Sequence, residues 1–153
     1  MNCLTRGAIA VVLFCAFCGG AAARGDDRLA CIGSLAMGHA YNTYAYIGTV
    51  HDLYRTERYT KEQVTATMSR IVRLCDFSVQ YLKDVKKGGV DADDSQAIDE
   101  LVGIYSMLRE EATALDAYGK SRDPKQLERY KQTRADLLPK IRTVLGSPMD
   151  KKD

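Results

Sequence analysis

The chain contains few of the residues from which metal and redox sites are built. It has two histidines, no tryptophan and five cysteines, and three of the cysteines lie within residues 1–23. His39 and His51 are 12 residues apart. On one helix that spacing separates them by about 18 Å along the axis and about 120° around it, so they cannot share a metal ion. Residues 24–153 also lack the C-x-x-C, C-x-x-C-H and helical Glu-x-x-His patterns. We therefore expect no bound metal and no cofactor.

Sequence signatures of enzymes are missing as well. There is no G-x-S-x-G, phosphate-binding loop or Gly-rich dinucleotide fingerprint. The acidic run 91–95 resembles the start of a calcium loop, but Gln96 stands where that loop needs Gly and Val102 stands where it needs Glu. The formal net charge is only +2, which gives no electrostatic reason to bind nucleic acid. These absences favour a protein that is not an enzyme.

Residues 1–23 have the pattern of a secretory signal peptide. Arg6 supplies a positive start, an apolar stretch of about 11 residues follows, and Ala21, Ala22 and Ala23 form a small-residue cleavage site. The apolar stretch is much shorter than the ~20 residues that span a bilayer, so we expect no stable membrane span after cleavage. We predict that the protein is exported, to the periplasm or to the medium.

The rarity of proline and the periodicity of apolar residues predict a helical fold. Only three prolines occur, and four helical patterns follow one another with short connections. The expected helices span about 27–55, 61–87, 92–118 and 124–145. Short connections make neighbouring helices antiparallel. We predict an all-α, up-down-up-down four-helix bundle over residues 24–146, after a cleaved signal peptide and before a polar tail at 147–153.

Helix ends and inward faces can be assigned from the same pattern. Thr60 and Gln63 match a capping box, and Gly88 and Gly119 are expected to end the second and third helices. The predicted inward stripe of the first helix is Leu29, Ile32, Ala36, His39, Thr43, Tyr46, Val50 and Leu53, and that of the second is Val64, Met68, Ile71, Cys75, Ser78, Leu82 and Val85. The stripe of the third helix is Ile98, Leu101, Tyr105, Leu108, Ala112 and Leu115. The stripe of the fourth is Leu127, Tyr130, Leu137, Leu138, Ile141 and Val144.

The first helix differs from the others because it carries no charge between Leu29 and His51. A membrane span is disfavoured because His39 and several tyrosines would lie in the bilayer. Two interpretations remain open: burial of the helix on more than one face, or an interaction surface. The residues of the candidate interaction surface are Tyr41, Tyr44, Tyr46 and His39.

Cys31 and Cys75 are the cysteines that remain after cleavage. Export favours a disulfide between them. The expected helix register opposes the bond, because it separates the two residues by on the order of 14 Å along the bundle, whereas bonded cysteines have alpha carbons about 4.4–6.8 Å apart. A disulfide and a pair of free thiols both remain open.

The first hypothesis for function is an exported, non-enzymatic binding module that acts through the first helix. Its partner is another exported protein or a second copy of the chain. One alternative is a carrier of a ligand or cofactor with a pocket near His39 in the bundle core. Another is an immunity or inhibitor protein of the exported compartment.

Cleavage after Ala23 gives the first testable prediction. The protein recovered from the periplasm or the medium is expected to begin at Arg24, as read by mass spectrometry of its N-terminal peptide. Recovery of this protein only inside the cells, with residues 1–23 still attached, would show that the segment does not direct export.

Overall fold

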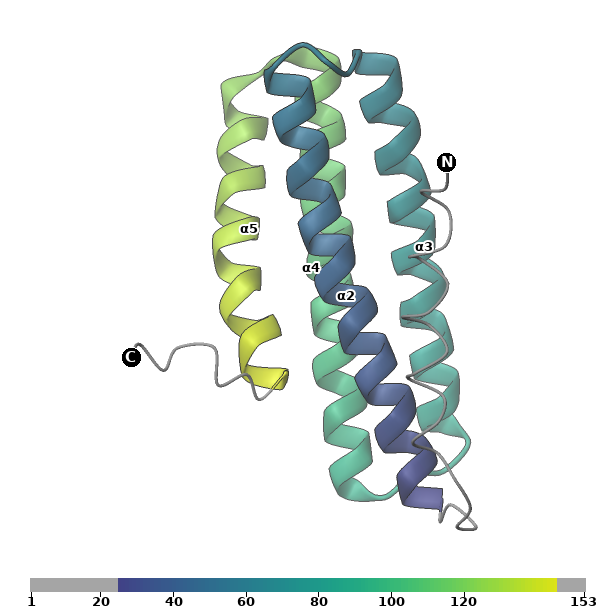
Figure 1. The fold of residues 1–153 in the computed structure, drawn as a ribbon. Helices are drawn as coiled ribbons and strands as arrows, with labels where there is room; N and C mark the ends of the chain where they lie inside the picture. Colours follow the sequence, from purple (N-terminus) through teal and green to yellow (C-terminus); the bar gives the residue numbers. More distant parts are fainter. Residues whose placement is uncertain (1–24, 146–153) are drawn as a thin grey trace, which may run out of the picture.

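The computed structural model describes residues 25–145, which form four helices (Figure 1). They are α2 (Gly25–Arg55), α3 (Lys61–Lys87), α4 (Ala92–Ser121) and α5 (Pro124–Val144). No strand occurs in this part of the chain, so the all-α prediction is confirmed. Successive helices run in opposite directions along the molecule. The predicted signal peptide, 1–23, and the predicted tail, 147–153, lie outside the described residues.

The start of α3 is fixed by the predicted capping box. The Gln63 backbone N–H donates to Thr60 Oγ1 over 3.3 Å, and the Thr60 N–H donates to Gln63 Oε1 over 2.8 Å. Each bond satisfies a backbone donor that the helix itself leaves unpaired. The Asp91 carboxylate caps α4 by accepting from the Asp94 N–H, and the Asp123 carboxylate caps α5 by accepting from the Lys125 N–H.

Gly88 ends α3 as predicted, because it is the C-cap that directly follows the last helical residue. Gly88 itself keeps a right-handed conformation, and Gly89 takes the left-handed one, with φ 91°. The end of α4 differs from the prediction. This helix continues past Gly119, and Arg122 adopts the left-handed conformation, with φ 56°. Gly119 lies where other helices approach closely, since its carbonyl accepts a hydrogen bond from the Tyr54 hydroxyl over 2.9 Å. Its small size serves that packing and does not end the helix.

α4 is the centre of the bundle. It packs against each of the other three helices, whereas α3 and α5 do not contact each other within the described residues. α2 lies across α4, between α3 and α5 (Figure 1). Its contacts with α3 and with α5 are much sparser than its contact with α4. α2 therefore has one well-buried face and two thinly covered flanks.

The predicted inward faces of α3, α4 and α5 are confirmed in the main. Every residue of the predicted α4 stripe is buried, and so are five of the seven in α3. In α5, Tyr130, Leu137 and Ile141 are buried, and the other three predicted positions are half-buried. α4 also buries Ile104 and Glu111, because it is packed on more than one side.

The predicted inward stripe of α2 is confirmed at Thr43 and Val50, which are buried, and is wrong by one residue elsewhere. The other side chains that pack into the core each follow a predicted position by one: Met37, Ala40, Tyr44, Ile47 and Tyr54. One residue is about 100° of rotation around a helix. The predicted residues Ile32, His39 and Tyr46 consequently lie on the flank that faces α3. The segment carries no charge, so the sequence gives no polar face from which the rotation could be read.

No helix within residues 25–145 is long and apolar enough to cross a membrane.

Candidate functional site

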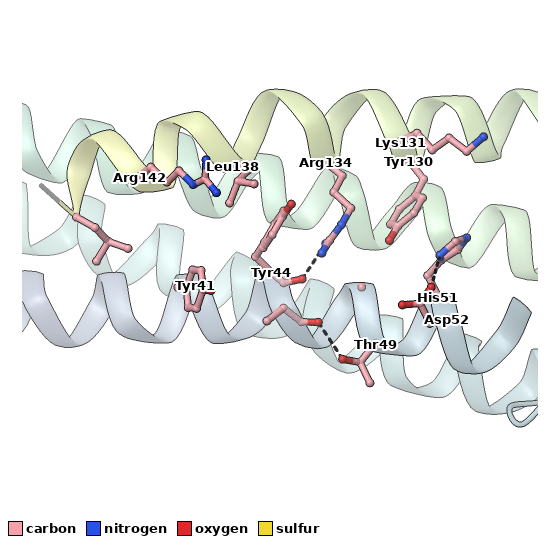
Figure 2. Close-up of a pocket in the computed structure, with 13 residues that line it drawn as sticks. Tyr41, Tyr44, Thr49, His51, Asp52, Tyr130, Lys131, Arg134, Leu138 and Arg142 are labelled. Atoms are coloured by element: carbon pink, nitrogen blue, oxygen red, sulfur yellow. Dashed lines mark hydrogen bonds and ion pairs between the residues drawn. The ribbon is translucent and has the colours of Figure 1, made fainter. Parts of the chain in front are cut away.

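The flank of α2 that faces α5 is a groove of about 560 Å³. Figure 2 shows side chains from both helices converging on it. Its chemistry is cationic and aromatic. The cations are Lys131, Arg134 and Arg142, and Asp52 is the one carboxylate in the lining. The rings that line the groove are those of Tyr41, Tyr44, His51 and Tyr130.

Arg134 lies at the centre of this groove and joins three helices. From α5, its Nη1 donates to Glu111 Oε1 of α4 over 2.6 Å and to the backbone carbonyl of Tyr44 in α2 over 2.9 Å. Its Cζ lies 3.8 Å from the centre of the Tyr44 ring, which is a cation–π contact. The guanidinium is thus held by an ion pair, a carbonyl and an aromatic face.

Gly48 makes room for this arrangement. A Cβ atom at position 48 would collide with the Arg134 guanidinium. The guanidinium cannot swing away without losing its bonds to Glu111 and to Tyr44. Gly48 is therefore required by the close approach of Arg134 to the α2 backbone, which offsets the helix stability that a glycine costs.

Glu111 is a carboxylate inside the core. Its side chain has no exposed surface, and its Oε2 atom has no hydrogen-bond partner among the described residues. Burial raises the pKa of Glu111 to about 7, and the hydrogen bond and charge of Arg134 act in the opposite direction. Loss of hydration therefore outweighs the ion pair at this carboxyl.

His51 lies at the end of the groove nearer the turn that leads to α3. Its ring centre is 4.9 Å from that of Tyr130, and its Nδ1 is 3.6 Å from Asp52 Oδ1. Burial lowers the pKa of His51, although Asp52 opposes the shift. The imidazole is therefore favoured in its neutral form here.

The flank of α2 that faces α3 is apolar and exposed. α2 contributes Ile32, Leu35 and Tyr46, with exposures of 41%, 64% and 47%. α3 contributes Leu74, Phe77 and Tyr81, and Phe77 is 68% exposed. We name these six residues, together with His39, the α2–α3 face. Two shallow hollows of about 300 Å³ and 310 Å³ lie along it, and His39 lines both.

His39 is held at the middle of this face by Tyr105. The Tyr105 hydroxyl donates to the Ala36 carbonyl over 2.9 Å, which uses its single proton. The contact of 2.9 Å between His39 Nδ1 and the same hydroxyl then requires Nδ1–H to be the donor. Burial raises the pKa of Tyr105 to about 12, so the hydroxyl stays protonated at neutral pH. In a neutral imidazole with its proton on Nδ1, the Nε2 atom of His39 is the acceptor.

The structure divides the four residues of the predicted interaction surface between the two flanks. Tyr41 and Tyr44 line the groove beside α5, with Tyr44 buried and Tyr41 39% exposed. Tyr46 and His39 line the face beside α3. The four do not form one continuous surface.

Cys31 and Cys75 are free thiols in this structure. Cys31 is exposed, whereas Cys75 is buried and its pKa is raised by burial to about 12. A thiol that stays protonated at neutral pH is a poor nucleophile. Among the described residues, no three His, Cys, Asp or Glu side chains gather closely enough to hold a metal ion.

Sequence reasoning missed the α3 side of the α2–α3 face and the buried pair of Glu111 and Arg134. A signal for the first is present in the sequence. Leu74, Phe77 and Tyr81 each immediately precede a position of the predicted inward stripe, so they repeat its heptad spacing on a second face.

Spacing also marks the buried pair. Glu111 lies three residues after Leu108 and four before Leu115, whereas its exposed neighbour Glu110 does not fit that spacing. Arg134 lies four residues after Tyr130 and three before Leu137.

Comparison with models of protein families, with curated proteins and with solved structures gives no match.

The buried carboxyl predicts a specific pH dependence of stability. The pKa of Glu111 rises from 4.5, the value for an unperturbed carboxyl, to about 7 in the folded chain. Its contribution to the free energy of unfolding is therefore fully present below about pH 4.5 and is lost as the pH rises through about 7. The loss should be on the order of 1–3 kcal/mol.

Urea denaturation over this pH range measures the effect, with Glu111→Gln as the test variant and Glu110→Gln as the matched exposed control. Glu111→Gln should lack the decline, and Glu110→Gln should keep it. Parallel pH profiles for the wild type and Glu111→Gln would contradict the assignment.

Proposed function

We propose that this chain is an exported, non-enzymatic binding protein that engages another protein chain through the α2–α3 face. One observation carries the proposal. Of the eight large hydrophobic residues that are exposed in the described chain, six belong to this face. Scattered exposed hydrophobics are ordinary on a protein surface, whereas a gathered set marks an interaction site.

The composition of the face supports a protein partner. Fully exposed, an aromatic side chain presents on the order of 200 Å², so six half-exposed large side chains offer several hundred Å² of apolar surface. That area approaches the ~800 Å² that each partner contributes to a standard protein interface. Tyr46 and Tyr81 add hydroxyl groups, and aromatic residues are enriched at such interfaces.

The hollows on either side of His39 add shape to the face. The first is lined by Leu35 and Phe77, among others, and the second by Tyr46 and Leu74. Hollows beside exposed rings provide the pockets into which a partner's anchoring side chains fit. The free Nε2 of His39 supplies an acceptor between them.

Site-specific photocrosslinking tests this proposal in the cells that make the protein. A benzophenone amino acid at position 77 should yield crosslinked species, because Phe77 is the most exposed ring of the face. The same amino acid at Arg129, an exposed position on α5, is the control and should yield none. Absence of any product at position 77, at a protein level equal to that of the control, would overturn the proposal.

The groove between α2 and α5 favours a second candidate function, the binding of a small anionic aromatic ligand. Three cations and one carboxylate line it, beside three tyrosine rings. The Arg134 charge is already matched by Glu111. Arg142 makes no ion pair within residues 25–145 and is exposed, so it is the cation that remains for a ligand. Rings beside such a cation suit a planar acid.

Calorimetric titration with salicylate tests this second function. Saturable binding is expected, and Arg142→Ala should weaken it about tenfold, because a charge-assisted hydrogen bond contributes on the order of 1.5 kcal/mol. Arg129→Ala, which changes an exposed arginine outside the groove, should bind like the wild type. Equal affinity of Arg142→Ala and the wild type would exclude the groove as the site.

A further inference from the structure

α3 carries two parallel heptad stripes. The first packs into the bundle and consists of Ile71, Cys75, Ser78, Leu82 and Val85. The second consists of Arg70, Leu74, Phe77, Tyr81 and Asp84, and all of its members are exposed. Its spacings alternate between four and three, which is the pattern of a coiled-coil seam. Each member precedes a member of the first stripe by a single residue, so the two stripes are about 100° apart around the helix.

The exposed stripe, which we name the α3 seam, is electrostatically self-complementary. Its apolar centre is formed by Leu74, Phe77 and Tyr81, and its ends carry opposite charges. Arg70 lies seven residues before Phe77, and Asp84 lies seven residues after it. Seven residues are two helical turns, so both charges fall on the same side of the helix as Phe77.

We infer that the partner of the α2–α3 face is a second copy of this chain, paired through antiparallel α3 seams about a two-fold axis at Phe77. The inference rests on the proposed function and names its partner. In this pairing the two helices are antiparallel and cross at Phe77. A residue that precedes Phe77 by some number of positions therefore faces, on the second copy, the residue that follows Phe77 by the same number. Arg70 then faces Asp84 twice, and Phe77 packs against Phe77 at the axis.

The surroundings of the seam favour this register. Arg70 is exposed and makes no ion pair within the described part of the chain, so its charge is unmatched in the single copy. Asp84 has Lys87 and Gln80 as neighbours, but more than half of its side chain is still exposed. The same register places Arg73 opposite Tyr81, which suits a cation–π contact, and it places Leu74 opposite Gln80. Phe77, Arg70 and Asp84 are thus the members that face seam residues of the second copy.

The hollows of the α2–α3 face lie beside the seam. One is lined by Phe77 and Tyr81 together with α2, and the other by Arg70 and Leu74 together with α2. The α3 helix of a second copy, packed along the seam, would have one of these hollows beside each of its two halves. Knobs of a facing helix fit into holes of this kind. The apolar area of the face is several hundred Å² on each copy, and it includes the Phe77 ring at the axis.

Charge reversal in the full chain tests the register. Sedimentation equilibrium over a wide concentration range should show reversible dimerisation of the wild type. Arg70→Asp alone and Asp84→Arg alone should each weaken the dimer about tenfold, because both symmetry-related pairs become repulsive. The double variant Arg70→Asp/Asp84→Arg should recover the wild-type dissociation constant, because each pair again has opposite charges.

Two further variants separate the seam from general effects of charge and folding. Phe77→Asp should abolish the dimer, since two carboxylates would meet at the axis, and its circular dichroism should match the wild type because Phe77 is largely exposed. Arg129→Asp changes the same kind of charge on α5 and should leave the dissociation constant unaltered. A wild type that stays monomeric, or a double variant that fails to recover, would overturn the inference.

These outcomes are distinguishable from failure of the proposed function. A monomeric wild type that still crosslinks to a different protein through position 77 would remove the second copy as the partner and keep the face as a binding surface. A wild type that neither dimerises nor crosslinks at position 77 would remove both.

Discussion

The packing of α2 across α4 is the constraint on which the other features depend. α3 and α5 stand on opposite sides of α2 and do not contact each other, so α2 alone closes the bundle over α4. Its buried face includes Ala40, Ile47 and Val50, all without exposed surface. A single buried face leaves two flanks, and each flank is a candidate binding surface. The lack of charge between Leu29 and His51 is explained by these surroundings, because both the core and the α2–α3 face are apolar.

A single guanidinium connects three of the four helices. Arg134 in α5 reaches Glu111 in α4 and the backbone of Tyr44 in α2. Buried ion pairs are often no more stabilising than apolar residues of equal volume, because both charges lose hydration. The pair does restrict the position of α2 relative to α5, because Arg134 is bonded to the Tyr44 carbonyl. Gly48 leaves room on α2 for the Arg134 guanidinium, and a larger residue there would collide with it. The geometry of the α2–α5 groove is therefore tied to the protonation of a carboxyl in the core.

The sequence predicts the helices and three of the four buried stripes because polar and charged residues mark the outward sides of α3, α4 and α5. The prediction fails on α2, where Ile32 and Ile47 look equivalent in the sequence and only one is buried. Rotation of α2 is decided by packing against α4, which no local pattern encodes. Glu111 was missed because of its residue type and not its spacing: an acid on a helix is normally solvated, and its burial depends on a partner 23 residues away. The α3 seam, in contrast, was readable, since its heptad lies beside the buried one.

The central position of α4 also has a kinetic consequence. α3 and α4 share the most extensive contacts in the bundle and are joined by a short turn, so their pairing costs little chain entropy. α2 meets α4 through contacts such as that of Tyr54 with Gly119, 65 residues away. Contacts between residues so far apart in the chain carry a larger entropy cost of loop closure, and elements with fewer contacts open at a lower free energy. Transient release of α2 would dissolve the α2–α5 groove and half of the α2–α3 face together, while the α3–α4 hairpin kept the seam in place.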